Sequence, residues 1–384
     1  MKILQLGKFY PIRGGVEKVM WDLTWALAER GVPCDMLCAY LKSDPVDPEH
    51  RGFSRETEEG RIIEFGPENR VICVPAFAKK AKTMLSRDMV RWLRRHAREY
   101  DIIHVHHPDP MAALALFLSG YKGRVILHWH SDILSQKLLL TLYHPLQWWL
   151  IRRAERIVGT SPVYLRESSA LSRQQHKVVC VPIGIQPIIY DPRAAEAIRA
   201  TMPDKKLVFA LGRLVPYKDF GTLVEAAKYL SSDYVILIGG SGPLQESLQW
   251  QIDAESLTDK VRLLGYLESW DVPNYFGACD IFVLCSDRKT EAFGVVQIEA
   301  MSCGKPVVAT KIPQSGVSWV NDNGVSGYNV PTHDPQALAA AIHQICDDPD
   351  VYMQFSAGAM ERFETLFTSR EMIDKIVKIY EKKM

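Results

Sequence analysis

The sequence predicts an α/β protein built from two doubly wound parallel-sheet domains. Short apolar runs alternate with amphipathic stretches from one end of the chain to the other. Strands that are apolar on both faces and separated by helices are typical of a parallel sheet covered on both sides. This alternation breaks once, at a proline-rich stretch at 182–203, and then begins again. A chain of 384 residues is long enough for two such domains.

The first predicted domain spans residues 1–187. A helix is expected at 16–31, and a long helical stretch at about 138–153. The apolar segment at 111–120 is expected to lie between two strands. The predicted strands of this domain lie at 2–7, 33–40, 101–107, 124–130, 156–161 and 177–184.

The second predicted domain spans residues 204–366, after a linker at 188–203. Its strands are expected at 206–213, 234–240, 261–266, 280–286 and 306–310, each followed by a helical segment. The segment 367–384 is expected to form a helix that crosses back to the first domain. Ligands of open parallel sheets bind beyond the carboxyl ends of the strands, so the informative residues should follow strands.

Composition excludes several functional classes. Lys and Arg number 46 against 45 Asp and Glu, so no global field points to a nucleic-acid partner. The start, MKILQLGKFYP, has no cleavable signal pattern, and no apolar run approaches the roughly 18 residues that span a bilayer. The eight cysteines include no C-x-x-C motif, which favours buried thiols in a reducing cytoplasm.

Gly14 and Gly15 lie between the first strand and the first helix. Consecutive glycines let backbone N–H groups approach a ligand closely, and a helix N-terminus favours an anion. The pattern is not the G-x-G-x-x-G fingerprint of dinucleotide-binding proteins. A tight turn explains the two glycines equally well.

Two cations, Arg213 and Lys218, follow the first strand of the second domain. Arg as a fork and Lys as a point charge can together bind a diphosphate. The alternative is a pair of solvated loop charges. A glycine-rich turn with Gly240 and Gly242 follows the next strand and could let a nucleotide lie against the backbone.

Glu291 and Glu299 stand eight residues apart in the stretch EAFGVVQIEAM. Glu291 is expected in a loop and Glu299 about two turns into the next helix, so both can face one ligand. Because that helix is otherwise apolar, Glu299 is expected to be buried with a partner such as ribose hydroxyls. The helix N-terminus would offer phosphate the backbone N–H groups of Phe293, Gly294, Val295 and Val296.

Other roles for this glutamate pair remain open from the residues alone. An acid/base pair needs a fixed separation between its carboxylates, which a sequence does not give. A metal site would need further Asp or His at regular spacing, and none flanks the pair. Two unrelated surface charges are the third alternative.

Four histidines lie on the expected strands of the first domain. His104 and His106 share one strand face, as do His128 and His130. A metal site is one interpretation, but histidines hydrogen-bonded at strand ends are the more ordinary one. His130, followed by Ser131 and Asp132 where a strand meets a loop, is the best placed of the four for a substrate.

Basic and aromatic residues gather in two stretches of the first domain. Such combinations suit the surface of an anionic membrane, although a solvated helix face over core aromatics is equally compatible. The residues that we single out as acceptor or membrane contacts are Arg91, Arg94, Arg95, Trp148 and Trp149.

The order of these motifs carries more information than each motif alone. The succession GGVE, HSD, GRLVPYKDF, GGSGP and EAFGVVQIEAMSCGKPVVAT resembles the retaining, nucleotide-sugar-dependent glycosyltransferases of family 4. The resemblance extends over nearly the whole chain. It implies the GT-B fold, in which two Rossmann-like domains face each other.

The resemblance also implies a role for each site residue. Arg213 and Lys218 would bind the donor diphosphate, Glu291 would contact hydroxyls of the donor sugar, and Glu299 would hold the ribose. Backbone groups from Phe293 to Val296 would contact sugar and phosphate. The remaining implied contacts come from Gly14 and Gly15 near the diphosphate, Gly240 and Gly242 beside the donor, and His130 against the transferred sugar.

Substrates and location follow from the same resemblance. It implies a nucleotide-sugar substrate, no cofactor, and no metal, because Arg and Lys take its place. The stretches SGVSWVN and DIIHVHHPDPMA look like members that build bacterial surface polysaccharides such as O-antigen, several of them mannosyltransferases. We therefore expect transfer of mannose from GDP-mannose to a lipid-linked or oligosaccharide acceptor, in the cytoplasm at the inner face of the plasma membrane.

Two positions depart from the family pattern. Ala292 follows Glu291 beside the expected sugar contact, and Ser318 stands where many relatives carry a glutamate. The first bears on the choice of donor. The alternative functions are transfer from a UDP-sugar, a sugar-nucleotide epimerase or hydrolase, and a non-catalytic nucleotide-sugar-binding protein.

Overall fold

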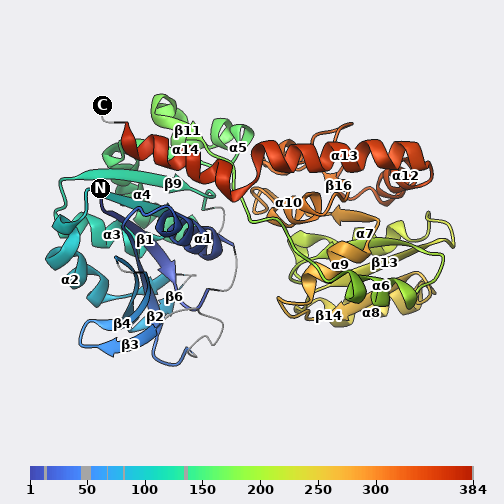
Figure 1. The fold of residues 1–384 in the computed structure, drawn as a ribbon, viewed down its shortest axis with the longest axis horizontal. Helices are drawn as coiled ribbons and strands as arrows, with labels where there is room; N and C mark the ends of the chain where they lie inside the picture. The colour runs from blue at the N-terminus through green and yellow to red at the C-terminus, as the bar shows by residue number, and fades with distance from the viewer. Residues whose placement is uncertain (13–14, 45–52, 67, 81–82, 134–136, 383–384) are drawn as a thin grey trace. The chain divides into compact units, whose positions relative to one another are not determined.

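The computed structural model describes residues 1–12, 15–44, 53–66, 68–80, 83–133 and 137–382. The chain divides into two units (Figure 1). Unit 1 comprises Met1–Ile183 together with Met372–Met384, and unit 2 comprises Gly184–Glu371. Each is an α/β domain around its own sheet, which confirms the predicted fold class, and each is described by itself below.

The described part of unit 1 contains a nine-stranded sheet in the order β11-β10-β9-β8-β1-β2-β5-β4-β3. Its strands are β1 (Ile3–Phe9), β2 (Cys34–Leu41), β3 (Phe53–Thr57), β4 (Gly60–Gly66), β5 (Asn69–Ala76), β8 (Ile102–His107), β9 (Arg124–Trp129), β10 (Arg156–Gly159) and β11 (Val178–Cys180). A separate two-stranded ribbon pairs β6 (Ala78–Lys80) with β7 (Thr83–Leu85).

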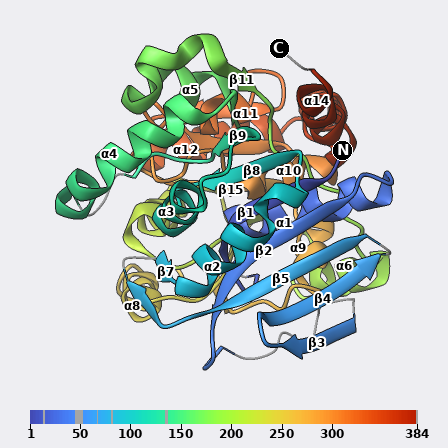
Figure 2. The ribbon, with the colours of Figure 1, turned by 90° about the vertical axis from the view of Figure 1, so that its left-hand side faces the viewer.

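This sheet is parallel from β11 to β5 and antiparallel at one edge. β5 pairs with β4, and β4 with β3, in antiparallel register; these strands lie side by side in Figure 2. None of β3, β4 and β5 was predicted from the sequence. The order of β5, β2, β1, β8 and β9 reverses direction at β1, so the switch point lies between β1 and β8.

Helices cover the sheet of unit 1. They are α1 (Val16–Glu29), α2 (Arg87–His96), α3 (Pro110–Ser119), α4 (Lys137–Arg153), α5 (Pro162–Glu167), α14 (Ser369–Glu381) and the 3₁₀ helices η1 (Ala97–Glu99) and η2 (Ser169–Lys177). Helix α3 shows why these segments are helical. Asp109 caps its first turn by accepting from Met111 N and Ala112 N, Pro110 takes the first helical position, and Gly120 ends it in a left-handed conformation.

Helix α14 completes the core of unit 1. Its apolar side chains Met372, Ile373 and Ile376 are buried against one face of the sheet, together with residues of α1. The segment that was expected to cross back therefore packs on Ile3 and Ile102, at the amino ends of the central strands.

Unit 2 has a six-stranded parallel sheet in the order β14-β13-β12-β15-β16-β17 within its described residues. The strands are β12 (Lys206–Leu211), β13 (Tyr234–Gly239), β14 (Val261–Gly265), β15 (Ile281–Leu284), β16 (Val307–Thr310) and β17 (Gly327–Val330). This is the 3-2-1-4-5-6 strand order of dinucleotide-binding domains, with the switch point between β12 and β15.

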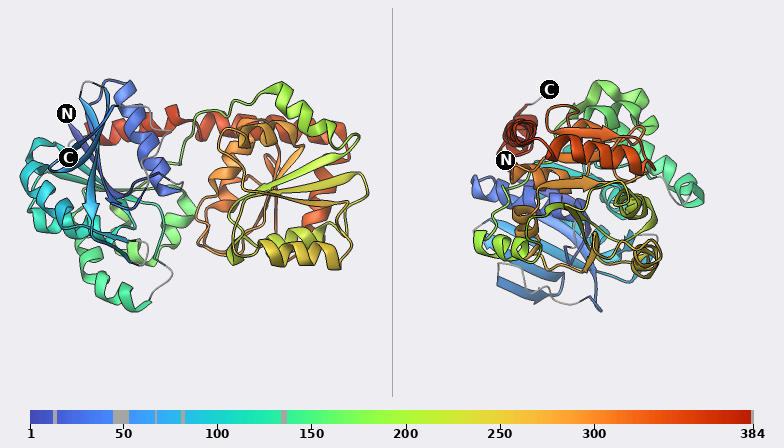
Figure 3. Two further views of the ribbon diagram at one scale, coloured as in Figure 1. Left: turned by 90° about the horizontal axis from the view of Figure 1, so that it is seen from below. Right: turned by 90° about the vertical axis from the view of Figure 1, so that its right-hand side faces the viewer.

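Helices lie on both faces of this second sheet (Figure 3). They are α6 (Pro192–Ala200), η3 (Pro216–Lys218), α7 (Phe220–Ala226), α8 (Gln245–Ala254), α9 (Val272–Ala278), α10 (Val295–Ser302), α11 (Val317–Val320), α12 (Pro335–Cys346) and α13 (Pro349–Leu366). The side chains of successive residues in β12 lie on opposite faces of the sheet. Val208 packs in a core with residues of α7, α8 and α12, whereas Phe209 meets the rings of Tyr275 and Phe276 on α9.

Residues 188–203, which we expected to form a linker, contain helix α6 and belong to unit 2. Asp191 caps this helix by accepting from Arg193 N, and Pro192 occupies its first turn. Proline at that position starts a helix rather than breaking one, because its missing N–H would have no partner there.

Candidate functional site

The predicted donor residues of unit 2 meet at its switch point. Arg213 and Lys218 follow β12, and Glu291 follows β15. These two strands are hydrogen-bonded neighbours, with Phe209 paired to Phe282. The loops at their carboxyl ends therefore lie side by side, which is where open α/β sheets bind ligands.

Lys218 and Glu291 form an ion pair at the centre of this site. Lys218 Nζ lies 2.5 Å from Glu291 Oε2, and the two side chains are only 12% and 14% exposed. Ser286, which is fully buried, donates from Oγ to the same carboxylate oxygen at 3.2 Å. Burial alone would lower the pKa of Lys218, but the pairing with Glu291 outweighs it and raises the pKa. The lysine therefore carries its charge at neutral pH.

Arg213 is exposed to solvent in the loop after β12, five residues before Lys218. Among the residues that the structure describes, its guanidinium has neither an ion-pair nor a hydrogen-bond partner. An arginine without a protein partner at a strand end is available to an anionic ligand.

Gly240 and Gly242 support the loop that carries Arg213. A Cβ on Gly240 would lie 1.9 Å from Gly212 O, and one on Gly242 would lie 2.5 Å from Leu214 O. The two loops are also joined by backbone hydrogen bonds, among them Leu214 N to Ser241 O at 3.0 Å. These glycines are needed for close packing of two backbones, and so they position Arg213.

The N-terminus of α10 follows Glu291 directly. Gly294 caps the helix with a φ of 75°. Glu299, which we expected to be buried, is half-buried on this helix. Within the described part of the chain no acceptor takes up the backbone N–H groups of Phe293, Gly294, Val295 and Val296.

A second group of titratable residues, which was not predicted from the sequence, begins at Asp219, next to Lys218. His333 Nδ1 lies 3.0 Å from Asp219 Oδ2, and its Nε2 lies 3.5 Å from Asp287 Oδ2. The three residues come from the loops after β12, β15 and β17. Each of them follows a strand, so the rule used for Arg213 would have selected them. Asp219 and His333 also have positive φ values of 50° and 57°, which are uncommon outside glycine.

In unit 1, Gly15 precedes helix α1 with a φ of 59° and is exposed. Gly14 lies outside the described residues. Glu17 stands in the first turn of α1, and burial raises the pKa of its carboxyl group, partly offset by Lys8. Lys8, another residue that we did not predict, is almost completely buried at the end of β1 and donates from Nζ to Pro108 O.

His130 belongs to a stack of buried histidines in unit 1. His128 and His130 have ring centroids 4.0 Å apart, and His106 and His130 have theirs at 5.2 Å. Burial, reinforced by His128, lowers the pKa of His130 well below its usual range. His130 is therefore a neutral imidazole one residue beyond β9, at the carboxyl edge of the sheet.

A metal site was one interpretation of these histidines in the sequence. His104, His106 and His128 each offer a ring nitrogen within 4.8 Å of the other two. However, the three rings stack with interplanar angles of 10° to 29°, so their in-plane lone pairs run alongside one another and do not converge. Both nitrogens of His106 also bond protein groups, namely His130 Nε2 and Gln5 Oε1. These residues do not fit a metal ion as they stand.

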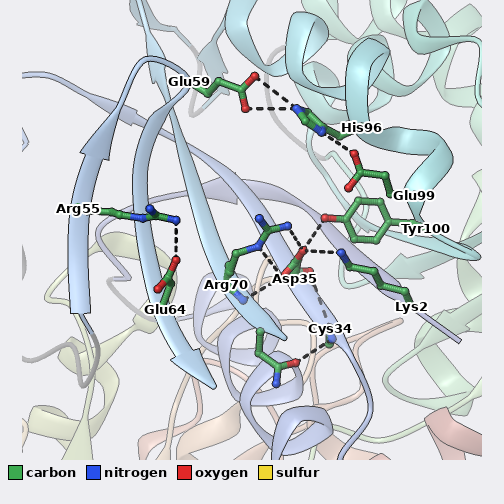
Figure 4. A network of polar contacts seen from close by, with 11 residues as sticks. Lys2, Cys34, Asp35, Arg55, Glu59, Glu64, Arg70, His96, Glu99 and Tyr100 are labelled. Atoms are coloured by element: carbon green, nitrogen blue, oxygen red, sulfur yellow. Dashed lines mark hydrogen bonds and ion pairs between the residues drawn. The ribbon is translucent and has the colours of Figure 1, made fainter. Parts of the chain in front are cut away.

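A cluster of charged residues in unit 1 surrounds Asp35 at the amino end of β2 (Figure 4). The Asp35 carboxylate is fully buried and lies 2.8 Å from Arg70 Nη2 and 3.6 Å from Lys2 Nζ. Tyr100 donates its hydroxyl to the same group at 2.6 Å. Because Lys2 precedes β1, this network lies at the amino ends of the strands, away from the ligand edge, and we interpret it as structural.

The predicted membrane contacts lie on neighbouring helices. Arg91, Arg94 and Arg95 are exposed on α2, but Arg91 pairs with Asp88 at 2.8 Å and Arg95 with Glu59 at 3.2 Å. Trp148 and Trp149 are half-buried on α4. Between α2 and α4, helix α3 exposes Leu114, Phe117 and Leu118, and the Phe117 ring meets Trp149 edge-on at 5.0 Å.

No helix in the described part of the chain combines the length and the apolar character that crossing a membrane requires.

Two family signatures match the chain, one in each unit. Residues 13–187 match the family described as Glycosyltransferase Family 4, and residues 194–362 match Glycosyl transferases group 1. The chain belongs to these glycosyltransferases. This confirms the family that the motif order indicated, and the second match covers the Lys218–Glu291 pair and the α10 N-terminus.

Curated relatives align with this glycosyltransferase over almost its whole length. O-antigen chain mannosyltransferase C of Escherichia coli is 29% identical, covering 99% of this chain and 98% of the relative. D-rhamnosyltransferase WbpZ of Pseudomonas aeruginosa is 28% identical, covering 96% and 93%.

Solved structures share the fold of this glycosyltransferase. Sucrose-phosphate synthase from Thermosynechococcus elongatus aligns with a TM-score of 0.78 at 23% identity, covering 99% of this chain and 98% of that chain. Anabaena HepE in complex with UDP aligns with a TM-score of 0.76 at 21% identity, covering 99% of both chains. The fold is GT-B.

Proposed function

We propose that this glycosyltransferase is a retaining, metal-independent hexosyltransferase that uses a nucleotide sugar. The observation that carries the proposal is the buried Lys218–Glu291 pair beside the open N-terminus of α10. A charged lysine, an unpaired arginine and unbonded N–H groups together suit a diphosphate. The glutamate next to them suits hydroxyls of the attached sugar.

The chemistry follows from where charge develops. The bond between the anomeric carbon and the diphosphate oxygen breaks, and a bond to the acceptor oxygen forms on the same face. The acceptor's hydroxyl proton passes to the departing phosphate oxygen. Lys218, Arg213 and the α10 N-terminus stabilise the negative charge of that leaving group, and we assign no protein nucleophile. Glu299 takes the ribose, and His130 lies against the sugar.

For the substrates, we propose mannose from GDP-mannose as donor and a lipid-linked or saccharide acceptor of a bacterial surface polysaccharide. The alignment with an O-antigen mannosyltransferase over 99% of the chain supports this choice. The alternative is a UDP-sugar donor, which the likeness to a UDP-bound structure favours. A sugar-nucleotide epimerase or hydrolase is a weaker alternative.

We further propose that α2, α3 and α4 rest on an anionic membrane at the cytoplasmic face. The support is a contiguous set of exposed apolar side chains on α3, flanked by exposed arginines of α2. Such a surface combines apolar insertion with attraction to anionic headgroups.

A donor screen tests the proposed activity. Ligands that bind the folded state raise the melting temperature, so GDP-, UDP- and ADP-sugars are compared for stabilisation. We expect GDP-mannose to stabilise most, and to release GDP only when an acceptor is present. Release of nucleotide without an acceptor and without a new glycosidic bond would instead establish a hydrolase.

A further inference from the structure

A row of buried polar side chains in unit 1 connects helix α14 to the carboxyl edge of the sheet. Gln5, His104, His106 and Tyr380 are completely buried, and His130 is 5% exposed. Strand register explains the row, because Gln5 is paired with His104 on the neighbouring strand, and His106 with His128. Buried polar groups are costly unless they are hydrogen-bonded, so the bonds they make fix their orientation.

The hydrogen bonds of Tyr380 and Gln5 determine which atoms of this row donate and which accept. Gln5 Nε2 donates to Tyr380 OH at 3.1 Å, and Tyr380 OH lies 2.5 Å from His104 Nδ1. Among the described residues the Tyr380 hydroxyl has no other acceptor for its hydrogen, so we assign this hydrogen bond as donated by Tyr380 to His104 Nδ1. Gln5 Nε2 also faces Cys34 Sγ at 3.7 Å. With its nitrogen committed to these two groups, the amide turns its Oε1 toward His106.

The next two hydrogen bonds, from His106 to Gln5 and from His130 to His106, follow from this orientation of the amide. His106 Nε2 lies 2.8 Å from Gln5 Oε1 and must donate to it. Burial lowers the pKa of His106 and keeps the ring neutral, so its other nitrogen carries no hydrogen. That nitrogen, Nδ1, lies 2.9 Å from His130 Nε2 and accepts from it.

Two ring nitrogens of the row have no hydrogen-bond partner among the described residues, namely His104 Nε2 inside the row and His130 Nδ1 at its end. His130 Nδ1 is buried and makes no hydrogen bond to any described residue. Because the hydrogen of this neutral ring is held on Nε2, Nδ1 carries a lone pair. It can accept a hydrogen bond but cannot donate one.

We propose that Tyr380, Gln5 and His106 are positioning residues that hold His130 in the Nε2–H tautomer, so that Nδ1 accepts a hydrogen bond from a hydroxyl group of a ligand. The ligand lies at the carboxyl edge of the first sheet. Only its identity as a sugar rests on the proposed function. The tautomer itself is a property of the free protein.

Nitrogen NMR of the free protein tests this proposal. Two-bond proton–nitrogen spectra of protein labelled with ¹⁵N-histidine distinguish the two neutral tautomers, and loss of signals in His130→Asn assigns His130. We expect the Nε2–H form in the wild type. A wild-type His130 that carries its hydrogen on Nδ1 would overturn the proposal.

Variants of the row test the positioning role. Tyr380→Phe removes the hydroxyl that takes up the Gln5 N–H, so the amide can turn and the Nδ1–H form of His130 should appear. Gln5→Leu removes the acceptor of His106 and should have the same effect. If both variants fold and His130 keeps the wild-type pattern, the three residues do not position it.

Tyr121→Phe is the matched control. It also removes one buried hydroxyl of unit 1, which donates to Tyr100 O at 2.9 Å, and it leaves the row intact. Its His130 spectrum should equal that of the wild type. The correct tautomer in a protein that transfers no sugar would leave this inference standing and reject the proposed function. Sugar transfer by a protein whose His130 carries its hydrogen on Nδ1 would support the proposed function and reject this inference.

Discussion

Lys218 Nζ and Glu291 Oε2 lie 2.5 Å apart, although 73 residues separate them in the chain. The pair joins the loops after β12 and β15, and the two charges cancel before any ligand binds. Glu291 therefore holds the Lys218 ammonium group in place before any ligand binds. In the function that we propose, this contact couples binding of the diphosphate to binding of the sugar.

Replacement of the lysine tests the pair directly. Lys218→Ala should lower kcat/KM about 100-fold or more, because it removes a positioned charge from the leaving group. It should also abolish the rise in melting temperature caused by the nucleoside diphosphate. Lys228→Ala, which breaks a Lys–Glu pair elsewhere in unit 2, should change neither. Equal losses in both variants would argue against a specific role for Lys218.

Gly240 should tolerate no side chain. In Gly240→Ala the new Cβ would meet Gly212 O at 1.9 Å, and the residue has a φ of 130°. We expect the free energy of unfolding to fall by about 3 kcal/mol. Gly324→Ala has a φ of 82° but no neighbour within 4 Å, so it should cost only about 1 kcal/mol. Urea titration measures both values, and similar losses would contradict the close packing of the two loops.

Acid should destabilise unit 1 through its buried histidines. Burial lowers the pKa of His107 and of His128 to about 3, from an ordinary value of 6.5. The unfolded chain therefore binds these protons more readily, so stability is full above pH 6.5 and is lost as the pH falls toward 3. For each of these histidines, the free energy of unfolding should fall by about 1.4 kcal/mol for every unit by which the pH drops within that window.

Melting temperatures measured from pH 8 to pH 5 check this slope. His128→Asn should flatten it, because one titrating group disappears. His176→Gln changes an exposed histidine and should leave the slope as it is. A wild-type melting temperature that stays constant down to pH 5 would contradict the assignment of neutral buried rings.

The Asp35 network should matter for stability and not for ligand binding. Asp35→Asn removes a fully buried carboxylate and leaves Arg70 and Lys2 without their partner. Both cations are about one-third exposed and can turn to water, so we expect a loss of about 2 kcal/mol, below the usual cost of breaking a buried pair. Chemical denaturation measures the loss, and unchanged nucleotide binding confirms that the network stands apart from the site.

The surface of α3 should bind anionic vesicles. Phe117→Ser removes a half-exposed ring and should weaken binding about tenfold, which corresponds to about 1.4 kcal/mol of apolar insertion. Added salt should weaken vesicle binding by the wild-type protein, because it screens the charges of the arginines. Trp250→Ser, on an exposed apolar residue of unit 2, is the control. Sedimentation with vesicles that is the same for all three proteins would exclude this surface.

The sequence predicted most of the parallel strands because they are buried on both faces and read as apolar runs. It also placed Arg213, Lys218 and Glu291 at strand ends, where the structure brings the last two into contact. It did not reveal β3, β4 and β5 in unit 1 or β17 in unit 2. The segment of β3 and β4 is rich in charged residues, and β3 is the outermost strand of its sheet.

The structure adds partners that single residues in a sequence do not show. Arg91 and Arg95 were selected as candidate acceptor or membrane contacts, and both are exposed and paired with carboxylates. Glu299 was expected to be buried because its neighbours are apolar, yet it lies on the half-exposed side of the short helix α10. Asp219 and His333 each follow a strand and could have been selected by the rule used for Arg213, but only the structure shows that they lie 3.0 Å apart across loops separated by 114 residues.

The division of the chain has a consequence for its synthesis. Unit 2 is one continuous segment, whereas the core of unit 1 includes Met372, Ile376 and Tyr380. The half that leaves the ribosome first therefore cannot finish its core until the helix made after unit 2 arrives. Unit 2 can fold while unit 1 still waits for α14, so the order of folding should be the reverse of the order of translation.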